Sequence, residues 1–326
     1  MKNRFWTAAA AVSIGIGLAT TSFADALKLS LSYEPSSAHY KWAEWAATEV
    51  EARTNGRHTI DVFGSGQLGS EREVEESLTL GLVDIGFVGA GHMAQRYAPI
   101  SIHLAAFLWR DLDHFLAYPT SDTYKELTGE YENISGSKVI ALTYFGQRHV
   151  TANEPLLTPE AFEGVKMRVP PVPIYMVFPD AVGANSTPVN FSELYLALQQ
   201  GVVVAQENPL PTIQAKKFYE VQTDIMLTGH MTDGYYTLIG GPTWGRLSEE
   251  DQGIISEVLR EAAAGASTDI IQSEKDLVDW FRENGTNVHE LDRQPFIDIV
   301  KPTILTGDWP WEARHIEDLL SLGANQ

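Results

Sequence analysis

Two arginines and an asparagine are the side chains in this sequence best suited to holding a small anion. Arg168 stands in the apolar, strand-like run 165–169, Arg148 follows another predicted strand, and Asn208 follows a third. Open α/β sheets bind ligands at the carboxyl ends of their strands. A guanidinium is a planar fork of five N–H donors that fits a carboxylate through two bonds. The pattern therefore predicts a carboxylate-binding site, to which Asn208 adds an amide donor.

Each of these residues also has a purely structural interpretation. A buried arginine is costly unless it is paired, and the chain has 43 Asp and Glu residues that could pair with it. Asn208 precedes Pro209 and could serve only as a turn residue. From the residues alone, both interpretations remain open.

Other chemistries have weaker support in the sequence. Residues 64–69 fit the Gly-x-Gly-x-x-Gly pattern, but Glu71 and Glu73 would face a bound phosphate, so a glycine turn that admits ligand or backbone is the better interpretation. The nine histidines show no metal-binding spacing, and the chain has no cysteine and no Gly-x-Ser-x-Gly. Pairs of nearby carboxylates are abundant in so acidic a chain, so they do not by themselves indicate a catalytic site. We expect no cofactor and no metal.

Composition and the N-terminus limit the partners and the compartment. The formal net charge of −20 and the pI near 4.8 argue against nucleic acid or an anionic membrane as a partner. Lys2 and Arg4 precede the apolar run 8–19, and small residues at Ala24 or Ala26 fit a cleavage site. We therefore expect residues 1–24 to be a signal peptide and the mature protein to be periplasmic.

The elements that must position these side chains follow from hydrophobic periodicity. A β-α-β-α-β order predicts a parallel sheet with crossover helices, with strands at 27–33, 58–63 and 81–88 and helices at 40–53 and 71–80. Further on, we expect a helix at 113–127, strands at 138–144, 202–206 and 235–239, and a helix at 191–200. The longest helical pattern, 248–283, begins with the capping residue Ser248 and an acidic first turn.

Several motifs spread along the chain occur together in one known family. They are Lys166-Met167-Arg168, Asn185-Ser186-Thr187-Pro188 with Phe191, Glu193, Tyr195, Ala197-Leu198-Gln199 and Gly201, and Gln206-Glu207-Asn208-Pro209. Supporting pieces are Gln67-Leu68-Gly69 with Glu71-Arg72, Gly81-x-Val83-Asp84 and Gly146-Gln147-Arg148. With them the sequence resembles a solute-binding protein of a tripartite ATP-independent periplasmic (TRAP) transporter. One departure is Val203-Val204-Ala205, where the family usually has Val-Asp-Gly.

The resemblance implies a two-domain α/β periplasmic binding protein of type II-like architecture, with mostly parallel sheets and a long helix across both domains. Domain I is expected at 25–147 and 235–265, and domain II at 148–234 and 266–326. The family's carboxylate-clamping arginine falls on Arg168 and its second arginine on Arg148. Its amide partner falls on Asn208, and Glu71 matches a position that lies near polar groups of the ligand in similar proteins. His39, Phe145 and Tyr235 are wall candidates, with Trp42, Trp109 and Tyr236 weaker ones.

The function expected from these features is capture of a small organic acid by domain closure, without catalysis, and its delivery by a monomer to TRAP permease subunits. A hydroxylated monocarboxylate, either a uronate or an aldonate, is the leading ligand. A C4-dicarboxylate or another hydroxy or keto acid is the alternative, with Arg148 as the second cation. A ligand-responsive sensor partner would share the same site. The alternative from another functional class is a secreted enzyme acting on acidic carbohydrate. Such an enzyme needs a catalytic acid and base, and no residue spacing in the sequence identifies this pair.

Overall fold

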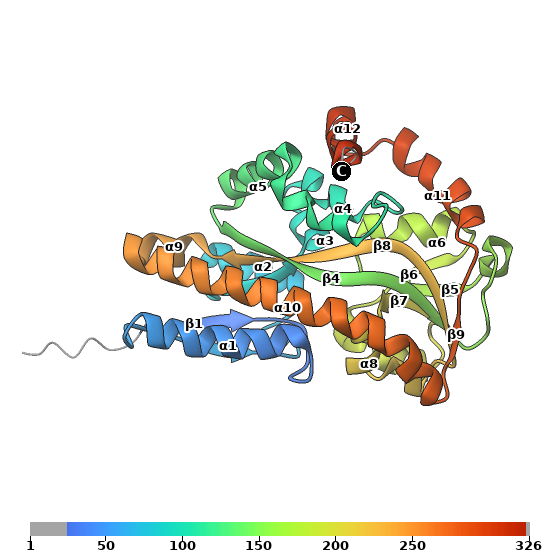
Figure 1. The fold of residues 1–326 in the computed structure, drawn as a ribbon, viewed down its shortest axis with the longest axis horizontal. Coiled ribbons are helices and arrows are strands. Elements are labelled where there is room, and N and C mark those ends of the chain that lie inside the picture. Colours follow the sequence, from blue (N-terminus) through green and yellow to red (C-terminus); the bar gives the residue numbers. More distant parts are fainter. Residues whose placement is uncertain (1–24, 324–326) are drawn as a thin grey trace, which may run out of the picture.

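The computed structural model describes residues 25–323, so the predicted signal peptide lies outside the described residues. Within them, the strands form one continuous sheet flanked by helices (Figure 1). The strands are β1 (Asp25–Ser30), β2 (His58–Phe63), β3 (Ile85–Gly89), β4 (Lys138–Ala152), β5 (Lys166–Val169), β6 (Asn185–Pro188), β7 (Ala205–Pro209), β8 (Asp224–Ile239) and β9 (Asn287–His289).

The sheet consists of two parallel groups joined by a long antiparallel pair. Its strand order is β2-β1-β3-β8-β4-β7-β5-β6, with β9 beside β8. β1 is parallel to β2 and β3, and β5 is parallel to β6 and β7, whereas the central β4 and β8 are antiparallel to each other. We call the β1–β3 side the first lobe and the β5–β7 side the second lobe. The predicted α/β fold is confirmed, and the sheet is mixed, since β8 is antiparallel to β3 and β4, and β4 is also antiparallel to β7.

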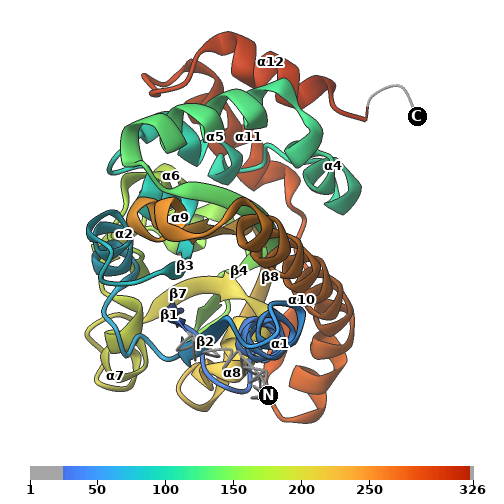
Figure 2. The same ribbon diagram turned by 90° about the vertical axis from the view of Figure 1, so that its left-hand side faces the viewer.

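The helices cover the sheet and the two lobes (Figures 1 and 2). They are α1 (Ala38–Arg53), α2 (Glu71–Leu80), α3 (Ala90–Met93), α4 (Leu112–Leu116), α5 (Asp122–Ser135), α6 (Val177–Ala181), α7 (Leu194–Gln199), α8 (Leu210–Ala215), α9 (Gly241–Arg246), α10 (Glu249–Glu283), α11 (Gln294–Thr306) and α12 (Ala313–Ser321). Within residues 25–323, no helix combines the length and apolar character needed to cross a membrane.

The long helix α10 ties the lobes together. Its 35 residues extend for about 50 Å, at 1.5 Å per residue. Ser248 caps its first turn by accepting a hydrogen bond from the Asp251 amide at 3.1 Å, as the sequence predicted. It packs on α1 and β4 and, further along, on α8 and β9 (Figure 1). Leu259 enters the hydrophobic cluster of the first lobe and Phe281 that of the second, so one element is buried in both lobes.

The two central strands are longer than the sequence indicated. The segments 138–144 and 235–239 are parts of the 15-residue β4 and the 16-residue β8. The first predicted strand ended at Tyr144, shortly before Arg148, and the second began at Tyr235, shortly after Asp233. Here the Arg148 and Asp233 side chains are buried and pair with each other, so the strands continue through them. The predicted domain boundaries at 147/148 and 234/235 accordingly fall inside β4 and β8.

Two other element predictions were wrong in detail. The helix predicted at 113–127 is divided into α4 and α5 by a 3-10 turn, Tyr118–Thr120, because Pro119 has no backbone N–H to continue the helix. The strand predicted at 202–206 lies at Ala205–Pro209 instead, so Asn208 is inside β7 rather than after it. Val202, Val203 and Val204 precede the strand.

Candidate functional site: a carboxylate-binding cavity between the lobes

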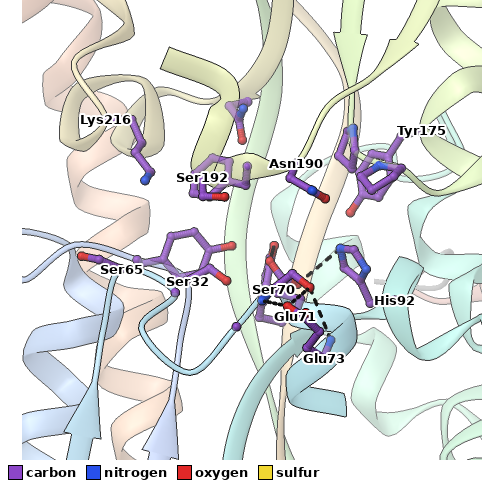
Figure 3. A pocket seen from close by; sticks show the side chains of 18 of the residues that line it. Ser32, Ser65, Ser70, Glu71, Glu73, His92, Tyr175, Asn190, Ser192 and Lys216 are labelled. Atoms are coloured by element: carbon purple, nitrogen blue, oxygen red, sulfur yellow. Dashed lines mark hydrogen bonds and ion pairs between the residues drawn. The ribbon is translucent and has the colours of Figure 1, made fainter. Parts of the chain in front are cut away.

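A cavity of about 360 Å³ lies between the two lobes (Figure 3). The first lobe contributes the segment after β1, the glycine loop before α2, and the beginning of α2. The second lobe contributes the end of β5, β7 and the segment before α7. The lining residues are Ser32, Tyr33, Ser65, Gly66, Gly69, Ser70, Glu71, Glu73, His92, Arg148, Arg168, Pro170, Pro171, Tyr175, Asn190, Phe191, Ser192, Asn208, Lys216 and Tyr235.

Arg168 is a buried cation in the cavity wall. It lies in β5 and is 1% exposed. Its Nε donates to the Val189 carbonyl oxygen at 2.9 Å, and its guanidinium carbon lies 5.9 Å from the centre of the Phe191 ring. Among residues 25–323, no carboxylate forms an ion pair with it, and burial lowers the pKa of Arg168 to about 10. Arg168 therefore brings an uncompensated positive charge to the cavity wall.

Arg148 lies in the same wall but is fully paired. Its NH2 donates to Glu207 Oε1 at 2.8 Å and its NH1 to Asp233 Oδ2 at 2.9 Å, while its Nε donates to Glu207 Oε2. Burial lowers the pKa of Arg148, but Glu207 and Asp233 more than offset this effect and leave it above its ordinary value. The structure thus shows the salt bridge that the sequence left open, with the guanidinium also 4.9 Å from the Tyr175 ring centre.

The two carboxylates around Arg148 differ in their electrostatics. Burial raises the pKa of Glu207, but Arg148 and His230 together bring it down to about 2. Burial raises the pKa of Asp233 to about 6, since Arg148 and the Tyr175 hydroxyl compensate it only in part. The Tyr175 hydroxyl, which also lines the cavity, donates to Asp233 Oδ2 at 3.0 Å. This group of charges compensates itself and leaves little net positive charge for a ligand.

Asn208 is held in place by a row of hydrogen bonds along β7. Its Oδ1 accepts from Arg148 NH2 at 3.3 Å, and its Nδ2 donates to Gln206 Oε1 at 2.5 Å. Gln206 in turn donates to the Thr151 hydroxyl at 2.9 Å. β7 is the parallel neighbour of β5, so Asn208 and Arg168 lie on adjacent parallel strands, with Asn208 inside its strand rather than after it.

Glu71 and Tyr235 form the first-lobe side of the cavity. Glu71 is the first residue of α2, whose bounds match the prediction, and it is 7% exposed. Its Oε2 accepts from the Gly89 amide at 3.0 Å and its Oε1 from the Tyr235 hydroxyl at 3.0 Å. His92 Nε2 is 3.8 Å from Glu71 Oε2 (Figure 3). A carboxylate can accept further bonds, so Glu71 can still receive one from a ligand hydroxyl.

His39 and Phe145 do not line this cavity. They line a neighbouring cavity of about 740 Å³ bounded by α1, α8 and α10. His39 stacks on Tyr33 with ring centres 4.9 Å apart, and Phe145 packs 4.6 Å from Tyr235, so the two tyrosines present the aromatic surface to the ligand cavity. Burial lowers the pKa of His39 to about 4, which keeps it neutral near pH 7.

The three weaker wall candidates belong to the protein interior or to helix packing. The Trp109 indole donates to the His103 carbonyl oxygen at 2.7 Å, and Tyr236 is fully buried in the main core. The Trp42 indole donates to Asp269 of α10 at 2.7 Å. None of the three lines the ligand cavity.

Sequence reasoning missed several lining residues. Tyr33, Tyr175, Asn190, Phe191, Ser192, His92 and Lys216 come from separate segments. Phe191 was visible as part of a motif but was not assigned to the site. The glycine loop was interpreted as a turn that could admit a ligand, and Ser65, Gly66 and Gly69 do line the cavity.

Comparison with known proteins shows the family. Residues 29–306 match the family model described as bacterial extracellular solute-binding protein, family 7. The sialic acid-binding periplasmic protein SiaP of Vibrio cholerae is 32% identical over 87% of this chain and 88% of its own. Two solved TRAP solute-binding proteins share the fold at 27% identity and TM-score 0.85, covering 91% of this chain and 98% of theirs. One, from Roseobacter denitrificans, has bound L-galactonate, and the other, from Polaromonas, has bound D-erythronate. The chain therefore belongs to family 7 of the bacterial extracellular solute-binding proteins, as a TRAP-type solute-binding protein.

Proposed function

We propose that this protein captures a sugar acid, an aldonate or a uronate, in the cavity between its lobes and delivers it to TRAP permease subunits. The observation that carries the proposal is the buried Arg168 guanidinium, which lines the cavity and forms no ion pair with a carboxylate of the described residues. A bidentate pair with a ligand carboxylate would compensate this charge.

The rest of the cavity favours one carboxylate and a hydroxylated chain. A second ligand carboxylate would need a second available cation, but Arg148 is compensated by Glu207 and Asp233, and Lys216 pairs with Glu34. The other charged groups of the wall include the carboxylates Glu71 and Glu73, which would repel a second ligand carboxylate. The neutral polar residues of the wall suit hydroxyl groups; they include Ser32, Ser65, Ser70, Asn190 and Ser192. These contacts support a sugar acid over a C4-dicarboxylate.

The names of relatives agree with this ligand class. SiaP of Vibrio cholerae is named for sialic acid, and an Escherichia coli relative that is 28% identical is named for 2,3-diketo-L-gulonate. The solved relatives with L-galactonate and D-erythronate hold aldonates. All four compounds are hydroxylated acids with a single carboxylate.

Location and oligomeric state complete the proposal. The protein acts as a monomer in the periplasm after removal of residues 1–24, and it binds its ligand without turnover and without nucleic acid. The absence of the first 24 residues from the mature protein can be checked by N-terminal sequencing of the exported chain. Light scattering at micromolar concentration gives the mass, and a stable dimer would contradict the monomer.

Titration calorimetry against a small panel of acids tests the proposed ligand class. We expect saturable 1:1 binding of aldonates or uronates, weaker binding of succinate, and no binding of the methyl ester of the same sugar acid, which lacks the carboxylate charge. Tighter binding of succinate would favour the C4-dicarboxylate alternative. Turnover of a uronate polymer with no binding of the monomer would favour the secreted enzyme.

A further inference from the structure

One ion pair joins the two lobes beside the ligand cavity. Glu34 follows β1 in the first lobe, and Lys216 follows α8 in the second. Lys216 Nζ pairs with Glu34 Oε1, and the two side chains are only 15% and 25% exposed. Figure 3 shows Lys216 reaching from the second lobe toward the cavity. Because the partners belong to different lobes, this pair exists only while the lobes are together.

Aromatic contacts surround the same ion pair. The Lys216 ammonium lies 4.6 Å from the centre of the Phe191 ring in the second lobe. Phe191 makes an edge-to-face contact with Tyr33 of the first lobe, with ring centres 5.8 Å apart. Tyr33 and Lys216 each line both the ligand cavity and the neighbouring cavity. These residues therefore form the partition between the two cavities.

We propose that Glu34 and Lys216 form an interlobe latch that stabilises the closed protein around its ligand, with Glu34 as the positioning residue. Glu34 holds the ammonium over Phe191, where the partly desolvated charge gains from both the carboxylate and the ring. The latch rests on the proposed function for its biological role, because it slows ligand release by favouring closure. Its existence as an interlobe contact does not depend on which ligand binds.

A direct role for Lys216 in holding the ligand carboxylate is the competing explanation, and Glu34→Gln separates the two. If Lys216 acts as a latch, Glu34→Gln and Lys216→Met each raise the ligand dissociation rate and Kd by roughly tenfold, and the double variant is no worse than either single one. If Lys216 contacts the ligand itself, Glu34→Gln leaves affinity unchanged or improves it, and only Lys216→Met weakens binding. That second pattern would overturn the latch.

The charge-exchanged variant Glu34→Lys/Lys216→Glu adds a rescue test. If the ion pair is a latch, the charge-exchanged variant should recover most of the wild-type dissociation rate. If Lys216 contacts the ligand directly, the variant should lose further affinity because a carboxylate now faces the ligand. Lys217→Met is the matched control, since Lys217 is the next residue, its side chain is 63% exposed, and it pairs with the nearby Glu220 at 3.3 Å. The control should bind like wild type.

A ligand-free measurement distinguishes failure of the latch from failure of the proposed function. The chain has no cysteine, so spin labels at Glu44→Cys on α1 and Gln199→Cys on α7 report the interlobe distance without interference. The latch predicts that Glu34→Gln shifts the ligand-free distance distribution toward open forms and that the charge exchange restores it. An unchanged distribution in both variants overturns the latch even if sugar acids bind, whereas a shifted distribution supports it even if they do not.

Discussion

At the scale of single residues, the two arginines of the cavity have opposite roles despite similar burial. Among the described residues, no carboxylate pairs with the buried Arg168 charge, so this charge destabilises the folded protein and can pair with a ligand carboxylate. Arg148 is surrounded by Glu207, Asp233 and Asn208 and holds the end of β7 in position. A buried pair is strongly destabilised by removing one partner, whereas removing an unpaired buried charge relieves a penalty. The two arginines should therefore respond differently to substitution.

Substitution of Arg168 should affect binding and not folding. We expect Arg168→Met to weaken sugar-acid binding by about 2–5 kcal/mol, because the ligand carboxylate loses its counter-charge in a desolvated cavity. The melting temperature without ligand should equal or exceed that of wild type. Calorimetry and thermal unfolding check both outcomes, with the exposed Lys166→Met of the same strand as the control. Unchanged affinity in Arg168→Met would contradict the role given to this residue.

Substitution of Arg148 should affect folding first. Arg148→Met leaves Glu207 and Asp233 as uncompensated buried carboxylates, so we expect a loss of about 3–5 kcal/mol in the free energy of unfolding. Chemical denaturation measures this loss. The double variant Arg148→Met/Glu207→Leu should recover part of it, because one stranded charge is removed. If Arg148→Met were as stable as wild type, the ion pairs would contribute nothing to folding.

At the scale of elements, the Glu274 carboxylate of α10 accepts two hydrogen bonds from the central strand β4. Glu274 Oε1 accepts from the Gln147 amide at 2.7 Å, and Glu274 Oε2 accepts from the Tyr144 hydroxyl at 2.6 Å. The β4 register shifts on both sides of this point. Gly146 has φ 130°, and a Cβ there would lie 2.6 Å from the Pro209 side chain, so only glycine fits. Arg148 follows Gly146 by two residues in β4 and lines the ligand cavity.

This contact should be sensitive to pH near neutrality. Burial raises the pKa of Glu274 from its ordinary 4.5 to about 7. The folded protein therefore binds the proton more tightly than the unfolded chain does. This tighter binding adds to the free energy of unfolding; the contribution is fully present below pH 4.5 and is lost as the pH rises through about 7. The loss amounts to about 3 kcal/mol at pH 8. Between pH 5 and pH 8, we expect wild type to lose thermal stability relative to Glu274→Gln.

Glu257→Gln is the matched control for this pH dependence, because Glu257 is on the same helix but exposed. The difference between wild type and Glu257→Gln should not change with pH. If the difference between wild type and Glu274→Gln were also constant, the buried carboxyl would not titrate in this range.

At the scale of the whole molecule, the described residues 25–323 contain elements that extend through both lobes, namely β4, β8 and α10. Opening must therefore bend these elements together rather than separate two independent domains. A ligand bound between the lobes would contact Arg168 and Asn208 on one side and Tyr33 and Glu71 on the other. Such a ligand would bind the closed form better than an open form, and this differential affinity would drive closure.

Small-angle scattering should detect this closure. Saturating sugar acid should reduce the radius of gyration of wild type, while at 100 times Kd it should also stabilise the protein by about 2.7 kcal/mol. Arg168→Met at the same ligand concentration should be stabilised by less than about 1 kcal/mol and should be compacted correspondingly less, because its Kd is higher. Stabilisation without compaction would mean that the ligand binds an already closed protein.

The sequence by itself determined the features that depend on nearby residues. The bounds of α2 and the Ser248 cap of α10 follow from periodicity and capping. Only the tertiary structure decided which cation is compensated. Arg148 meets Glu207 and Asp233 across 59 and 85 residues of sequence, and no local pattern records such pairing. The tertiary structure also decided that His39 and Phe145 lie behind Tyr33 and Tyr235. Packing between distant elements determines which aromatic ring faces the cavity, and the sequence alone does not show this packing.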